Sequence, residues 1–308
     1  MNLVSLILVL LIEQWRPLPS TEVVQRPLDH YTAFLEKHFN AGEAHHGVIA
    51  WILGVVGPVL LTGLGYWLCL RVHPLLAVAF NVGVLYLTMG FRQGSHHFTE
   101  IQSLLRAGSL DAARASLGQW SGGSNHALSQ EEIVRLTIEK ALAGAHRFVF
   151  GVMFWFVVLP GPTGAVLYRL AAFFHRKWAF ASEAELGRFG QFARHAFRLI
   201  DWIPTRLTAI SFAIVGDFED AIYCWRTQAA RWFDPLLGVV LAAGAGALGV
   251  RLGMPIHQED GSLDDRPELG TGDEADLAFL DSTVGLVWRA LVLWLAFLLI
   301  LTIVRSIG

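Results

Sequence analysis

The sequence predicts an all-α integral membrane protein, a polytopic helical bundle with short cytoplasmic helices and one or more broken or re-entrant helices. Two observations lead to this prediction. The chain of 308 residues is 54% hydrophobic and only 16% charged, whereas soluble domains carry about 25% charged residues. Its mean hydropathy is +0.48, and the apolar residues gather in runs long enough to cross a bilayer. We expect such a protein to cross a membrane several times.

The same composition excludes several other classes of protein. So high an apolar content argues against disorder, and a formal net charge of −3 gives no basic excess for a nucleic-acid partner. The two cysteines, Cys69 and Cys224, stand beside apolar runs and are interpreted as packing residues. The adjacent histidines at 45–46 and 96–97 would point about 100° apart on a helix, so we predict no metal site.

Three runs are clear candidates for membrane spans, since about 20 residues of helix cross the hydrocarbon core. Residues 48–70 and 75–91 carry no charge and are joined by a four-residue break, which predicts a hairpin. The third run, 284–304, is interrupted only by Arg289. Residues 148–159, 203–215 and 235–250 are weaker candidates. A Pro/Gly break at 160–164 allows a kinked span, a re-entrant loop or a tight hairpin before residues 165–174.

We treat residues 1–308 as one membrane domain with two polar segments. Lys and Arg concentrate in residues 92–147, so the excess of positive charge on the cytoplasmic side predicts a cytoplasmic helical loop there. Ser129 followed by Glu132 is typical of a capping box at a helix start. Residues 254–283 form an acidic segment that is interpreted as a solvated loop, with binding of a cation or Mg-nucleotide as the alternative.

Three further patterns can each be interpreted in two ways. Residues 182–200 predict a basic amphipathic helix, which either lies in the headgroup plane or packs its Phe stripe on the bundle. Residues 244–249 fit G-x-G-x-x-G, but they lie in an apolar run and are interpreted as small-residue packing. Arg169, Arg206 and Arg289 lie in or beside apolar runs. They either extend to the headgroups or bind an anionic group such as phosphate.

Four motifs in order resemble the CobD/CbiB family. Residues 163–169 end in Tyr168-Arg169, residues 201–208 read Asp-Trp-Ile-Pro-Thr-Arg-Leu-Thr, residues 245–253 carry Gly-Ala-Leu-Gly, and residues 265–270 read Asp-Arg-Pro-Glu-Leu-Gly. The resemblance implies a multi-pass protein of the bacterial inner membrane, with structural motif positions at Pro204, Gly246, Gly249, Gly253, Pro267 and Gly270. It also implies a ligand-binding group of Tyr168, Arg169, Asp201 and Arg206, with a corrinoid or another anionic small molecule as the ligand.

The family reaction joins adenosylcobyric acid to aminopropanol or its phosphate through an amide, using ATP and Mg, late in cobalamin biosynthesis. The resemblance therefore implies ATP and Mg as cofactors if that activity is retained. Where family enzymes carry Glu-Asn-Thr, this chain has Gly144-Ala145-His146, and Phe197 and Arg198 stand in place of paired Asp residues. Two further polar stretches become apolar around residues 171–173 and 232–241. These departures predict altered or lost catalysis, and they leave the question of enzymatic activity open.

The same departures suggest one alternative function. An AmpE-like membrane regulator of β-lactamase induction would act without catalysis, through membrane lipid and a membrane or signalling protein partner. A transporter is a weaker alternative, suggested only by the broken spans and the intramembrane arginines.

Overall fold

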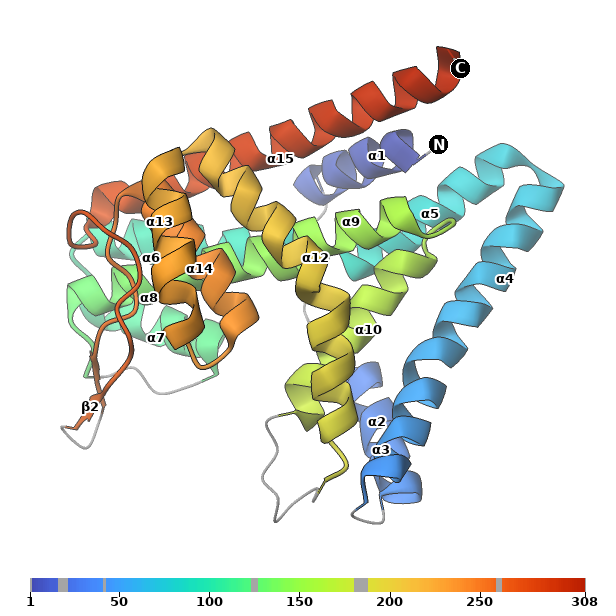
Figure 1. Ribbon diagram of the computed structural model, residues 1–308, viewed down its shortest axis with the longest axis horizontal. Coiled ribbons are helices and arrows are strands. Elements are labelled where there is room, and N and C mark those ends of the chain that lie inside the picture. Colours follow the sequence, from blue (N-terminus) through green and yellow to red (C-terminus); the bar gives the residue numbers. More distant parts are fainter. Residues whose placement is uncertain are drawn as a thin grey trace. The chain divides into compact units, whose positions relative to one another are not determined.

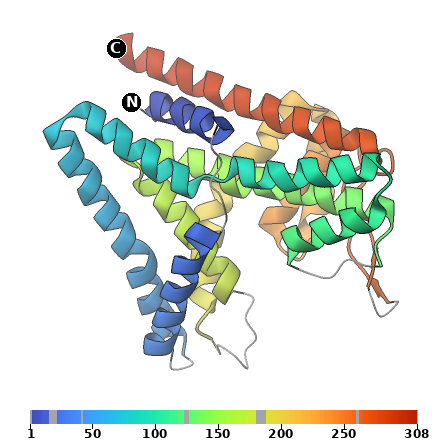
Figure 2. The same ribbon diagram turned by 180° about the vertical axis from the view of Figure 1, so that it is seen from behind.

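The computed structural model describes residues 2–15, 22–40, 43–122, 127–179, 188–258 and 262–307. Most of these residues are helical (Figures 1 and 2). The chain divides into two compact units, which are described separately below. The first unit holds Met1–Gln93 and Arg147–Pro204, and the second holds Gly94–His146 and Thr205–Gly308.

The first unit is built from helices alone within its described residues. They are α1 (Asn2–Trp15), α2 (Glu22–Phe39), α3 (Ala44–Trp51), η1 (Ile52–Val56), α4 (Gly57–Val72), α5 (Pro74–Thr88), α9 (Gly151–Val158) and α10 (Thr163–Trp178), with the first half of α12 (Gln191–Val215). The helices α3, η1 and α4 follow one another without a break. The π-helical turn η1 therefore interrupts the hydrogen-bond pattern but not the helical run.

The hairpin expected from the first two apolar runs is present. His73 ends α4 and caps α5 by accepting a hydrogen bond from the Leu75 N–H at 3.2 Å. Pro74 at the first position suits a helix start, because proline lacks the N–H that would stay unbonded there. The second run is shorter than predicted, since α5 ends at Thr88 after 15 residues. That length is about 22 Å, below the roughly 30 Å of hydrocarbon.

The Pro/Gly break forms the tight hairpin, one of the three geometries that the sequence allows. Helix α9 ends at Val158, and α10 begins at Thr163 and packs back against it (Figure 1). A Cβ added to Gly164 would lie 1.8 Å from the Trp155 carbonyl oxygen. Only glycine permits this approach of the two backbones.

The predicted amphipathic segment and the run at 203–215 belong to one helix, α12, which contains Pro204. Residues 182–187 lie outside the described residues, and the helix begins at Gln191 rather than at 182. The aromatic stripe packs on the bundle. Phe189 meets Trp178 edge to face at 4.9 Å between ring centroids, and Phe197 stacks on His175 at 4.7 Å. Both phenylalanines are buried, so this face is not free to enter a lipid headgroup layer.

The second unit combines helices with a small two-stranded ribbon. Its elements are α6 (Phe91–Arg106, which begins in the first unit), α7 (Leu110–Ser121), α8 (Gln130–Ala145), η2 (His146–Phe150, only His146 in this unit), the second half of α12, α13 (Phe218–Gln228), η3 (Ala229–Arg231), α14 (Pro235–Leu248), β1 (Ile256–His257), β2 (Leu263–Asp264) and α15 (Leu277–Ile307). The described residues of the segment 92–147 are therefore mostly helical, as predicted. The acidic segment is not one loop, because it contains the antiparallel β1–β2 pair and α15 begins at Leu277.

Small residues let α14 pack closely in this unit. A Cβ on Gly246 would lie 2.4 Å from the Asp220 carbonyl oxygen of α13, and one on Gly244 would lie 2.7 Å from Leu142 Cδ1 of α8. Nearly all of α14 is buried. The G-x-G-x-x-G pattern thus serves helix packing, as the sequence predicted.

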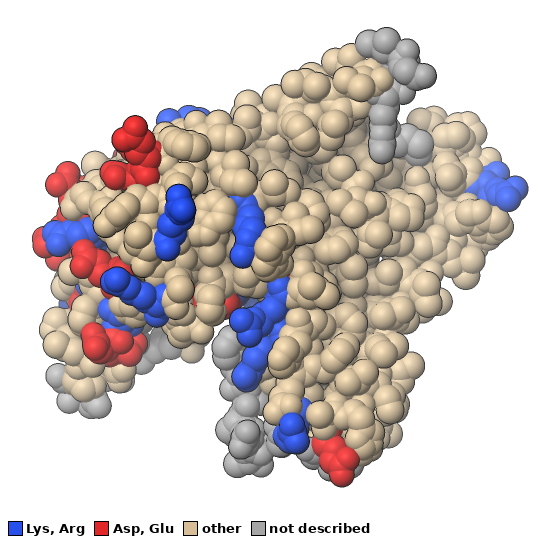
Figure 3. Space-filling model, viewed as in Figure 1, with Lys and Arg blue, Asp and Glu red and all other residues tan. Residues whose placement is uncertain are grey.

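Three helical runs are long and apolar enough to cross a membrane. They are Ala44–Val72, Gln130–Val158 and Leu277–Val304. The first and third agree with the prediction. The second is longer than the expected run at 148–159, because α8 continues through η2 into α9. Charged side chains gather over α13 and the β1–β2 segment of the second unit, whereas the face along α4 is almost free of charge (Figure 3).

Candidate functional site

Two of the four predicted ligand-binding residues are in contact. The Tyr168 hydroxyl of α10 donates a hydrogen bond to Asp201 Oδ1 of α12 at 2.8 Å, and both side chains are buried in the first unit. The Tyr168 ring lies against Gly151, where an added Cβ would be 2.2 Å from the ring. The motif residues of α10 and α12 therefore form a packed contact.

The other two predicted residues lie elsewhere. Arg169 is half-buried, and its guanidinium stands over the Phe148 ring at 4.4 Å, a cation–π distance. Arg206 is half-buried in the second unit, five positions after Asp201 along α12.

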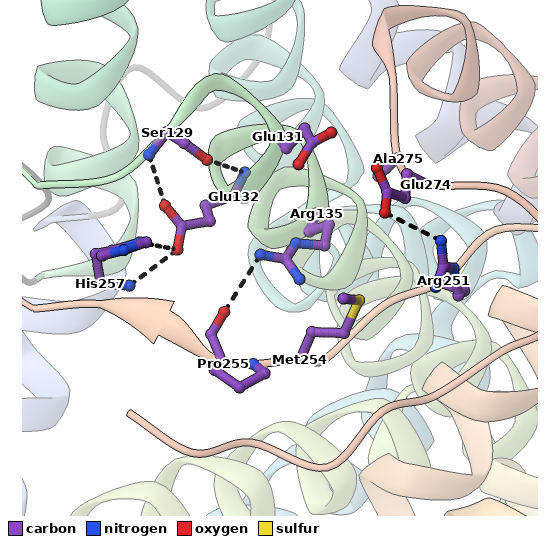
Figure 4. A pocket seen from close by; sticks show the side chains of 10 residues that line it. All are labelled: Ser129, Glu131, Glu132, Arg135, Arg251, Met254, Pro255, His257, Glu274 and Ala275. Carbon is purple, nitrogen blue, oxygen red and sulfur yellow. Dashed lines mark hydrogen bonds and ion pairs between the residues drawn. The ribbon is translucent and has the colours of Figure 1, made fainter. Parts of the chain in front are cut away.

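A second polar group is built on the start of α8, in the second unit. The capping box predicted from Ser129 and Glu132 is present. The Ser129 N–H donates to Glu132 Oε2 at 2.6 Å, and the Glu132 N–H donates to Ser129 Oγ at 3.2 Å. The other carboxylate oxygen, Glu132 Oε1, accepts a hydrogen bond from the His257 backbone N–H at 2.9 Å. The same oxygen lies 2.8 Å from His257 Nδ1 (Figure 4). Glu132 thus ties the start of α8 to β1.

Glu139, two turns further along α8, ties the same helix to the motifs at 245–253 and 265–270. Its Oε1 accepts the Gly253 N–H at 2.9 Å, and its Oε2 accepts a hydrogen bond from Arg266. Leu252 and Leu269 pair as an antiparallel bridge between the two motifs. Gly253 has φ +67°, and an added Cβ would lie 2.0 Å from the Pro267 carbonyl oxygen. Two of the motifs behind the resemblance thus meet at one buried carboxylate.

A cavity of about 170 Å³ lies beside these contacts, between the first turns of α8 and residues 251–257. Arg135 and Arg251 both line it, and Met254 and Pro255 lie below Arg135 (Figure 4). Met254 has φ +63°, the one non-glycine residue with a positive φ among those the structure describes. Backbone held in this region concentrates at functional sites.

Sequence reasoning missed this site, although a signal existed. Glu132, Arg135 and Glu139 are spaced at i, i+3 and i+7, which places them on one face of α8. All three are buried charges, and charged residues are almost never fully buried unless they are paired. The fold supplies their partners from a segment more than one hundred residues away.

The comparisons with known proteins now identify the family. The sequence model of the CobD/CbiB protein family matches residues 15–287. This chain belongs to the CobD/CbiB family. No solved structure matches it.

Three curated relatives named "Cobalamin biosynthesis protein CobD" illustrate the similarity. The Stutzerimonas stutzeri protein is 36% identical over 269 residues, which cover 86% of this chain and 86% of that protein. The Chromobacterium violaceum protein is 37% identical over 233 residues, covering 76% and 73% of the two chains. The Mycobacterium tuberculosis protein (strain CDC 1551) is 29% identical over 254 residues, covering 79% and 76%.

These matches correct the expected divergence toward AmpE. Each relative described above carries the CobD name, and the identity extends over most of both chains. The AmpE-like alternative has no support, and neither has altered catalysis. The prediction of lost polarity depended on a few short motifs. It overlooked Glu132, Arg135, Glu139 and Arg266, which are distributed over the sequence and gathered only by the fold.

Proposed function

We propose that this protein takes part in cobalamin biosynthesis as a multi-pass protein of the bacterial inner membrane. Its reaction joins a corrinoid carboxylic acid to aminopropanol or its phosphate through an amide bond. The supporting observation is the 36% identity to a cobalamin biosynthesis protein across 86% of each chain. Three helical runs of sufficient length and apolarity support the membrane location.

The proposed reaction needs an energy source, because a carboxylate and an amine do not condense spontaneously in water. ATP with Mg would supply that energy. As the C–N bond forms, one carboxylate oxygen would leave as part of the phosphate that is split from ATP. The residues present fit such a group. Arginines bind phosphate oxygens, and carboxylates are the ligands that Mg²⁺ prefers. Arg135, Arg251, Glu131 and Glu274 all line the one cavity described above.

Complementation tests this function. A bacterial strain that lacks the cobinamide-forming step and depends on cobalamin for growth would receive the full chain on a plasmid. We expect growth on precursors of that step. Empty-vector cells should grow only when cobinamide itself is added, which shows that the later steps are intact. Absence of growth, despite a tagged chain detected in the membrane fraction, would reject the proposed function.

We also propose that Tyr168, Arg169, Asp201 and Arg206 contribute to binding of an anionic corrinoid. Arg206→Ala should raise the dissociation constant for adenosylcobyric acid about tenfold, because one charge-assisted contact is worth about 1.5–3 kcal/mol. Binding would be measured in detergent by the corrinoid absorbance. Gel filtration would check that the variant is folded. An unchanged dissociation constant would remove Arg206 from the binding group.

A further inference from the structure

We propose that the cavity at the start of α8 binds a phosphate group, held by the guanidinium groups of Arg135 and Arg251. The inference rests on the proposed function and names the substrate chemistry that this site would take. The phosphate could belong to ATP or to the phosphorylated amino alcohol, since the two share the same recognised group. The experiment below separates these two sources.

Arg135 is a buried cation whose hydrogen-bond donors are only partly used. The residue is 7% exposed, and its one described hydrogen bond runs from Nη2 to the Pro255 carbonyl oxygen at 3.3 Å. Its Nε has no hydrogen-bond partner among the described residues. Glu139 interacts with it electrostatically, but the Glu139 oxygens accept hydrogen bonds from Gly253 and Arg266. A guanidinium has five N–H donors, and burying them without acceptors is costly.

Arg251 supplies the second cation that lines the cavity (Figure 4). Its Nη2 pairs with Glu274 Oε1 at 3.1 Å, and its Nη1 lies 4.0 Å from Glu268 Oε1. Its Nε, like that of Arg135, has no hydrogen-bond partner among the described residues. Two arginines with spare donors that line one cavity suit a tetrahedral phosphate better than a single planar carboxylate, because phosphate offers more acceptor oxygens.

The carboxylates of the cavity refine the choice of ligand. Both oxygens of Glu132 accept hydrogen bonds from Ser129 and His257, so Glu132 is already occupied. Glu131 and Glu274 add negative charge to the lining. A bare phosphate would be repelled by them. A phosphate that carries Mg²⁺, or an ammonium group on the same molecule, would be attracted.

The volume limits the size of the ligand. Sites for drug-sized molecules measure about 300–1,000 Å³, whereas this cavity measures about 170 Å³. It can hold a small phosphomonoester or the terminal phosphates of a nucleotide. A corrinoid ring is far too large for it. The corrinoid would therefore have to bind elsewhere on the protein.

Calorimetry on the purified full chain in detergent tests the proposal. The probes are ethanolamine phosphate and Mg-ATP, each at constant ionic strength maintained with potassium chloride. We expect saturable binding of at least one probe. Binding of ethanolamine phosphate alone assigns the cavity to the amine phosphate, and binding of Mg-ATP assigns it to the nucleotide. Absence of saturable binding for both probes would overturn the proposal.

Three variants locate the binding. Arg251→Gln and Arg135→Gln should each raise the dissociation constant of the bound probe about tenfold or more. Arg106→Gln is the matched control, because Arg106 also pairs with a carboxylate, Asp281, but does not line the cavity. The dissociation constant of the probe for Arg106→Gln should equal that for the unmodified chain. If Arg135→Gln fails to fold, the result for Arg251→Gln alone decides, because Arg251 is partly exposed and its replacement disturbs the fold less.

The outcome is independent of the complementation experiment. Unchanged affinity in folded Arg251→Gln would overturn the phosphate site even where the unmodified chain restores growth. Conversely, a chain that fails to restore growth but loses phosphate affinity in Arg251→Gln would keep the site and reject the proposed function.

Discussion

Glu139 stabilises the second unit as a buried carboxylate with a cationic partner. The Glu139 and Arg266 side chains are only 9% and 11% exposed, and removing one member of a buried pair costs about 3–5 kcal/mol because the other charge stays uncompensated. Glu139→Gln should therefore lower the thermal unfolding midpoint strongly, followed by tryptophan fluorescence in detergent. Asp111→Asn breaks the exposed pair with Arg114 and should cost under about 1 kcal/mol. Equal losses in the two variants would contradict this account.

Cys224 is a packing residue whose reactivity reports on the fold around α13. Its thiol is buried and lies 3.7 Å from the Thr271 hydroxyl, and burial raises its pKa above the ordinary value. The reactive thiolate therefore forms only at higher pH than in an exposed cysteine. In a Cys69→Ser chain, maleimide labelling at pH 7 should be slow until detergent denaturation exposes Cys224. Rapid labelling of the folded chain would show that this position is open.

At the scale of elements, two glycines with the same φ separate backbone strain from steric contact. Gly249, which ends α14, and Gly253 both have φ +67°, but an added Cβ meets nothing within 4 Å at Gly249 and lies 2.0 Å from the Pro267 carbonyl oxygen at Gly253. Gly249→Ala should cost about 1–2 kcal/mol from strain alone. Gly253→Ala should cost clearly more and weaken the Glu139 contact. Thermal midpoints of the two variants measured side by side would check the order; a smaller loss at Gly253 would contradict it.

The elements differ in how far the sequence predicts them. The capping box at Ser129, the small-residue packing of α14 and the hairpin of α4 and α5 depend on neighbouring residues, and all three were predicted. The run at 148–159 was predicted too short, because α8, which precedes it in the same long helical run, begins with charged residues. Glu132, Arg135 and Glu139 resemble a polar surface in the sequence until their contacts with Gly253, Pro255, His257 and Arg266 are known. Tertiary partners distant in sequence decide this burial, and no local pattern shows them.

At the scale of the whole molecule, the short length of α5 conflicts with the membrane topology that the positive charges predict. Placing residues 71–74 outside and residues 92–147 in the cytoplasm requires α5 to cross the bilayer. The helix falls short of the hydrocarbon core by about 8 Å, a mismatch that costs a few kcal/mol. Its eight Leu, Val and Phe residues return about 0.3–0.6 kcal/mol each on insertion. These two contributions nearly cancel.

The distribution of positive charge should therefore decide the orientation. Residues 92–129, which precede the long run Gln130–Val158, hold three Arg residues and the turn at 71–74 holds one, so the excess of positive charge favours a cytoplasmic loop. Alkaline phosphatase fused after His73 should be active, because it folds only outside the cytoplasm, and green fluorescent protein fused there should be dark. After Gly108 the two reporters should exchange behaviour. Phosphatase activity at neither position would show that α5 stays on the cytoplasmic side, and activity only after Gly108 would invert the topology.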